Sequence, residues 1–173
     1  MKKFIIGFLL LSVMLIGCVK QTVKVGEDKI IGQEGYVRMM PKDGEVLNKN
    51  GAKEIWLGVG PMNGKRETPA SGVTATHVFA DTTSVHTVQI NIALASKGLF
   101  YEGWVKKPDT TEMISTGQFH STFGDVRHAL TFEANQDLSA YTEVLVTLEK
   151  DDGNTAPGTI VAEGALKKVE RAK

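Results

Sequence analysis

Residues 88–94 read Val-Gln-Ile-Asn-Ile-Ala-Leu, so that large apolar side chains alternate with polar or small ones. Successive side chains of a β-strand point to opposite sides, and a period of two therefore predicts a strand that buries one face. Residues 141–149 read Tyr-Thr-Glu-Val-Leu-Val-Thr-Leu-Glu and repeat the pattern. These two stretches predict β-sheet and not helix for the centre of the chain.

Other short runs of strand-forming residues surround these two stretches. They cover residues 74–80, 99–105, 113–119, 126–133 and 159–166, with turn-forming residues between them. About seven short strands in succession predict an all-β fold, and we expect an antiparallel immunoglobulin-like β-sandwich. A small open barrel is the alternative.

The N-terminal end of the chain has the features of a bacterial export signal. A basic start, Met1-Lys2-Lys3, precedes an uncharged apolar stretch over residues 4–17. This stretch is short for a transmembrane helix, which needs about 20 apolar residues. Residues 1–17 are therefore predicted to be a lipoprotein signal peptide.

Cys18 follows the sequence Leu15-Ile16-Gly17, which resembles the lipobox of bacterial lipoproteins. The resemblance implies that Cys18 carries a diacylglyceryl group, becomes the new N-terminus and receives a further fatty acid such as palmitate. Two or more acyl chains anchor a protein stably. The expected location is then the cell membrane or the outer membrane, facing outside the cytoplasm. The alternative is that Cys18 is a small buried hydrophobe at the end of an uncleaved helix.

The rest of the chain divides by composition. Residues 18–72 are mostly polar and rich in glycine, which predicts a lipidated tether with possible extra strands at 35–39 and 53–59 and a loop over 60–72. Residues 73–166 form the predicted β-sandwich domain, and residues 167–173 a charged C-terminal tail. Cys18 is the only cysteine, so the chain has no internal disulfide.

Charge and motifs narrow the function. Lys and Arg number 20, and so do Asp and Glu, which gives a formal net charge of zero and argues against a nucleic-acid partner. The sequence has neither a Gly-x-Ser-x-Gly nor a Ser-x-x-Lys motif, and its carboxylates are scattered. We therefore expect a protein that is not an enzyme, with no catalytic residues and no cofactor.

The four histidines offer the best candidates for a metal site. A hairpin between residues 113–119 and 126–133 would bring His120 and His128 together, with Asp125 nearby. Two neutral imidazoles without a third ligand placed by the sequence make only a weak site. We expect no metal here, and we keep a metal-binding or metal-sensing domain as the alternative function.

Two segments resemble a known family. The first is Phe100-Tyr101-Glu102-Gly103-Trp104-Val105 with the following Ile114-Ser115-Thr116-Gly117-Gln118-Phe119, and the second spans residues 141–161 and contains Val-Leu-Val-Thr-Leu-Glu, Asp-Gly and Ala-Pro-Gly-Thr. Together they resemble the extracytoplasmic C-terminal domain of anti-sigma-K-type factors over roughly residues 73–166. The resemblance implies the fold, a location outside the cytoplasmic membrane, and a sensing or protein-binding role.

This chain departs from such factors at its N-terminal end. They carry a cytoplasmic sigma-binding domain and a transmembrane helix, whereas here a predicted export signal and lipidated cysteine take that place. Sequestration of a sigma factor is therefore not carried over. We expect a membrane-anchored lipoprotein that binds a protein or an envelope component through edge strands or end loops, first of all the loops at 61–72, 106–112 and 151–157.

Structural roles are expected for the residues that carry the resemblance. Tyr101 and Trp104 have opposite parity on one strand, so Trp104 is predicted to fill the core while the hydroxyl of Tyr101 stays in water. Gly117 is predicted to permit a bulge or a close backbone approach before Phe119.

Overall fold

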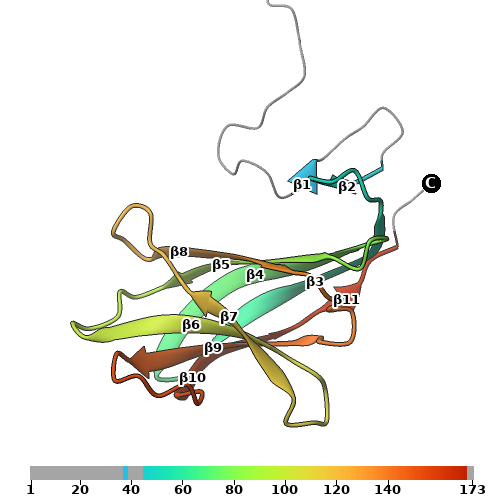
Figure 1. Cartoon of the computed structure of the whole chain (residues 1–173). Coiled ribbons are helices and arrows are strands. Elements are labelled where there is room, and N and C mark those ends of the chain that lie inside the picture. The colour runs from blue at the N-terminus through green and yellow to red at the C-terminus, as the bar shows by residue number, and fades with distance from the viewer. Residues whose placement is uncertain (1–36, 39–44, 171–173) are drawn as a thin grey trace, which may run out of the picture. The chain divides into compact units, whose positions relative to one another are not determined.

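The computed structural model describes residues 37–38 and 45–170, which all belong to the unit Gln33–Lys173. The described residues form strands, turns and loops and no helix (Figure 1). The strands are β1 Val37–Arg38, β2 Leu47–Asn48, β3 Glu54–Lys65, β4 Thr68–Phe79, β5 Ser84–Ile92, β6 Leu99–Lys106, β7 Met113–Gln118, β8 Arg127–Ala134, β9 Glu143–Lys150, β10 Thr159–Ala165 and β11 Lys167–Lys168.

Nine of these strands form one antiparallel sheet. Its order is β7-β6-β9-β10-β3-β4-β5-β8, and β11 also pairs with β3. The two edge strands meet at one bridge, where His120 N donates to Ala129 O (3.0 Å) and Ala129 N donates to His120 O (2.9 Å). The sheet is thus an open barrel that is nearly closed. The all-β prediction is confirmed, while the immunoglobulin-like sandwich is not, because the strands belong to one continuous ladder and not to two packed sheets.

All seven strands predicted between residues 74 and 166 are present, but the sheet also contains residues that we expected to be a loop. β3 and the first residues of β4 form a long hairpin over residues 54–79, paired through Pro61↔Val73 and Met62↔Gly72. The loop prediction for residues 60–72 is wrong. Part of the expected charged tail is also ordered, because Lys167 and Lys168 of β11 pair with Val59 and Gly58.

The core lies on the concave side of the sheet. β5 contributes Val88, Ile90 and Ile92, each at most 2% exposed, as the alternation predicted. Leu94 lies beyond the end of β5 and is 56% exposed. Other strands and the β8–β9 connection supply further members of the main cluster, which include Met62, Tyr101, Val105, Leu130, Leu138, Val144, Val146 and Ala162.

Tyr101 and Trp104 of β6 differ from expectation. Tyr101 belongs to the main core cluster, where it is 6% exposed, and its hydroxyl donates to the carbonyl of Ala93 (3.0 Å). Trp104 lies on the other face of β6, where it is 6% exposed and its Nε1 donates to Thr147 Oγ1 (2.8 Å). Opposite parity was predicted correctly, but the inner position belongs to Tyr101.

The predicted bulge at Gly117 is confirmed. The pairing of β6 with β7 shifts register between Gly103 and Trp104, so that Thr116 has no partner in the ladder. Gly117 has φ +97°, a backbone conformation that costs other residues free energy.

Residues 45–52, called the cover segment, pack on part of the outer face of the sheet. Val46 and Ala52 pack on Phe79 and Val85 in a second apolar cluster. Asn48 fastens this segment, because its Nδ2 donates to Asp81 Oδ2 (2.8 Å) and to Thr83 Oγ1 (2.9 Å). Hydrogen bonds from Thr83 and then from Asn48 lower the pKa of Asp81 to about 2.

Candidate functional site: a groove on the outer face of the sheet

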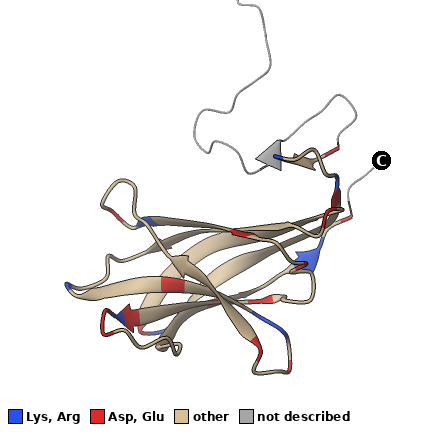
Figure 2. Cartoon of the chain, in the orientation of Figure 1, with Lys and Arg blue, Asp and Glu red and all other residues tan. Residues whose placement is uncertain are grey.

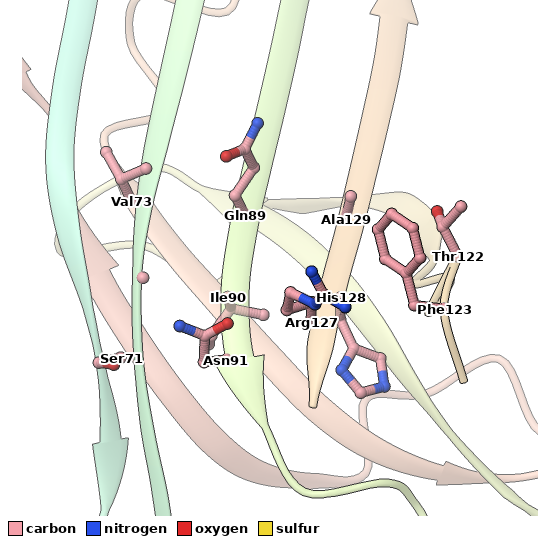
Figure 3. A pocket seen from close by; sticks show the side chains of 11 residues that line it. Ser71, Val73, Gln89, Ile90, Asn91, Thr122, Phe123, Arg127, His128 and Ala129 are labelled. Carbon is pink, nitrogen blue, oxygen red and sulfur yellow. The ribbon is translucent and has the colours of Figure 1, made fainter. Parts of the chain in front are cut away.

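A groove of about 350 Å³ lies on β4, β5, β8 and the loop 121–126 (Figure 3). Small-molecule sites occupy roughly 300–1,000 Å³, so this groove has the size of a small ligand site. The residues that line it are Ser71, Gly72, Val73, Gln89, Ile90, Asn91, Thr122, Phe123, Arg127, His128 and Ala129.

Strand alternation places the polar side chains of the groove. Gln89 and Asn91 point outward from β5 because Val88, Ile90 and Ile92 point into the core. The register aligns Gln89 with Val73 on β4 and with Ala129 on β8. The floor of the groove is therefore a row of side chains across three strands whose main chains are paired.

The loop 121–126 forms one wall. It is held by Ser121, whose hydroxyl donates to Asp125 O (2.7 Å) and accepts from Asp125 N (2.9 Å). Gly124 has φ +65° at the turn. This loop presents Phe123, which is 69% exposed, and Val73 of β4, which is 46% exposed, lies on the opposite side of the groove (Figure 3). Arg127 lies over the ring of Phe123, 4.2 Å from its centroid.

The charge of Arg127 is compensated beside the groove. Its Nε and Nη2 atoms donate to Asp125 Oδ2 at 2.9 Å and 2.5 Å. These hydrogen bonds lower the pKa of Asp125 and raise that of Arg127. Figure 2 shows Lys, Arg, Asp and Glu mainly at strand ends and in loops. No other charged side chain lines the groove, which is therefore close to neutral.

The two histidines of the metal alternative do not converge. His128 points into the core, where it is 7% exposed, packs edge-on against Tyr101 with ring centroids 5.5 Å apart, and lies 3.0 Å from Val126 O through Nδ1. His120 is exposed and faces Ala129 across the bridge, and neighbouring positions of a strand alternate between faces. Among the described residues no group of three metal-binding side chains occurs. The structure gives the metal alternative no support.

The other predicted site features have mixed outcomes. Cys18 and the predicted signal peptide lie outside the described residues. The described residues contain no helix that could span a membrane. Of the three loops singled out, 61–72 contributes Ser71 and Gly72 to the groove.

The loop 106–112 is tied to the β8–β9 connection. Tyr141 donates a hydrogen bond to Glu112, and Lys107 pairs with Glu112 at 2.7 Å. Lys107 lowers the pKa of Glu112, and Glu112 in turn raises those of Lys107 and Tyr141. In the loop 151–157 the side chains are exposed, and Glu149 beside it accepts a hydrogen bond from Gly158 N (2.8 Å). Neither loop lines the groove.

Sequence reasoning missed the groove residues Gln89, Asn91, Phe123 and Arg127. The alternation of residues 88–94 already implied that Gln89 and Asn91 point outward. The sequence carried no signal that places Phe123 beside them, because that depends on the pairing of β5 with β8.

Comparison with known proteins identifies the family. The family model for the C-terminal part of the anti-sigma-K factor RskA matches residues 32–164, which is most of the chain. The match begins well before residue 73 and so includes β3 and the cover segment. Searches of curated proteins and of solved structures gave no match. The chain therefore belongs to the family of the anti-sigma-K factor RskA C-terminal domain.

Proposed function

We propose that this protein is a lipid-anchored regulatory module of the cell envelope that binds a protein or envelope component and performs no chemistry itself. The observation that carries the proposal is the family match over residues 32–164, because the matched domain is a part of an anti-sigma factor. Sequestration of a sigma factor is not included, since the match concerns the C-terminal part alone.

The anchor in this proposal is Cys18. Its support is the basic start, the apolar stretch and the Leu-Ile-Gly-Cys sequence. Lipid chains on Cys18 would hold the domain at the outer surface of the cytoplasmic membrane or at the outer membrane. The residues between Cys18 and the cover segment would then serve as the spacer.

The binding surface in this proposal is the groove. It is the part of the outer face of β4, β5 and β8 that the segment around Val46 leaves uncovered. It combines an exposed aromatic side chain with amide and hydroxyl groups, a composition typical of ligand sites.

Metabolic labelling tests the anchor. Cells that express the full chain and receive a palmitate analogue should incorporate it, and the mature protein should begin at an acylated Cys18 by mass spectrometry. Cys18→Ala should abolish labelling, whereas the control Ser12→Ala should retain it. Continued labelling of Cys18→Ala would refute the lipid assignment.

Site-specific photo-crosslinking in intact cells tests the binding surface. A diazirine side chain at position 91 should give a discrete adduct, because this position faces the groove. The same side chain at the exposed position 152 is the control. Equal adducts from both positions, or none from position 91, would overturn the assignment of the groove.

A further inference from the structure

The polar side chains of the groove have unused hydrogen-bonding capacity. Within the described residues, the side-chain amides of Gln89 and Asn91 make no hydrogen bond to the protein. Each amide carries a two-proton donor and an acceptor. Two residues on one strand face are about 7 Å apart, so both amides can reach one small ligand.

The main chain beneath the groove cannot pair with an added strand from a peptide ligand, because its backbone groups are already paired. Gln89 pairs with Val73 on one side and with Ala129 on the other. An extended peptide binds a sheet mainly by adding a strand to a free edge, which needs unpaired backbone groups. A ligand here has to be recognised by side chains alone.

The charge and the polar side chains of the groove argue against anionic ligands and against purely apolar ligands. Because Asp125 compensates Arg127, an anion such as phosphate gains no net attraction. A purely apolar ligand would bury the amides of Gln89 and Asn91 without partners, which is unfavourable. The ligand that fits is uncharged, rich in hydroxyl or acetamido groups, and has an apolar face.

Phe123 supplies the surface for that apolar face. Its ring is 69% exposed although Arg127 lies over it. Figure 3 places the ring beside β8 at the wall of the groove, with Ala129 next to it. The C–H groups of a sugar ring can stack on such an aromatic surface while its hydroxyls meet the amides.

We propose that the groove binds an uncharged saccharide, specifically an acetamido sugar of an envelope glycan. Gln89 and Asn91 hydrogen-bond its hydroxyl and acetamido groups, and Phe123 stacks on its ring. This inference rests on the proposed function, because it names the envelope component that the module would bind.

Calorimetric titration of the full chain in detergent with β-1,4-linked tetra-N-acetylglucosamine tests the inference. We expect saturable binding, and we expect the double variant Gln89→Ala/Asn91→Ala to bind at least about tenfold more weakly, because it loses several hydrogen bonds. Phe123→Ala should weaken binding by a similar factor. The matched controls are Gln136→Ala, an exposed amide, and Ile55→Ala, an apolar side chain that is 60% exposed.

Three outcomes would overturn the inference: no binding at millimolar saccharide, binding that the groove variants leave unchanged, or displacement of the saccharide by inorganic phosphate. These outcomes do not by themselves refute the proposed function, which the crosslinking experiment tests separately. If crosslinking from position 91 yields a peptide adduct while the saccharide does not bind, the regulatory module stands and its ligand is a protein.

Discussion

At the residue scale, His86 is a fully buried histidine with one ring nitrogen that has no hydrogen-bond partner. It is 0% exposed, its Nδ1 lies 2.7 Å from Thr76 Oγ1, and its Nε2 has no hydrogen-bond partner in the described structure. Burial lowers the pKa of His86 to about 4, because the charged imidazolium loses its hydration. The folded protein therefore holds this side chain neutral at neutral pH.

The lowered pKa of His86 predicts acid sensitivity. Between pH 6.5 and pH 4 the unfolded chain binds a proton at this residue and the folded chain does not, so stability falls as the pH falls. The contribution lost over this interval is about 3 kcal/mol. Urea unfolding at several pH values should show a flatter dependence for His86→Gln. The exposed His120→Gln should behave as wild type, and an unchanged slope in His86→Gln would contradict the prediction.

Replacing Trp104 and replacing Phe123 by alanine should have different effects on stability, one large and one small. Trp104 is 6% exposed and hydrogen-bonded to Thr147, so Trp104→Ala should lower the free energy of unfolding by about 3–5 kcal/mol. Phe123 is 69% exposed, so Phe123→Ala should change it by less than about 0.5 kcal/mol. Urea unfolding measures both. Equal losses would show that the two rings have similar surroundings.

At the element scale, β7 depends on its bulge. Gly117 has φ +97° in a register shift, and an alanine there would strain the backbone. Gly117→Ala should therefore cost about 1–2 kcal/mol, measured by urea unfolding. Gln118→Ala, an exposed position on the same strand, is the control and should be close to neutral. If both variants were equally stable, the bulge would not require glycine.

The strands that sequence could and could not predict differ in composition. β5 and β9 were predictable because their apolar residues alternate without interruption. β3 was partly missed because Gly60, Pro61 and Gly64 suggest a loop. These glycines have a packing reason instead: a Cβ on Gly60 would lie 2.0 Å from Ala165 O, and one on Gly64 would lie 2.2 Å from Ala70 N. Close approach is a tertiary property that local pattern does not reveal.

At the scale of the whole molecule, the edges of the sheet meet at a single bridge. Proline at position 120 lacks the N–H that donates to Ala129 O, so His120→Pro should release β7 from β8. Hydrogen exchange of the Ala129 amide, which donates to His120 O, should then accelerate by at least about tenfold. The control His120→Ala keeps the backbone donor and should retain protection. Unchanged exchange in His120→Pro would mean that the bridge does not close the sheet.

The sequence pattern could not distinguish the predicted β-sandwich from the open barrel that the structure shows. Alternation of apolar side chains is the same in a sandwich and in an open barrel, since both bury one face of every strand. The distinction lies in which strands pair, and here β10 joins β9 to β3 in one ladder. The groove could not be predicted from the sequence for the same reason, because Gln89, Val73 and Ala129 become neighbours only through the strand order β4-β5-β8.

The placement of β3 has a consequence for biosynthesis. A ribosome produces β3 before the other long strands, and β4 follows at once to pair with one of its edges. The other edge waits for β10 and β11, which are made last. Until then the nascent chain carries an unpaired strand edge, a state that favours aggregation. A chain that stops after β9 would keep this edge exposed, which would make it a target for chaperones and proteases.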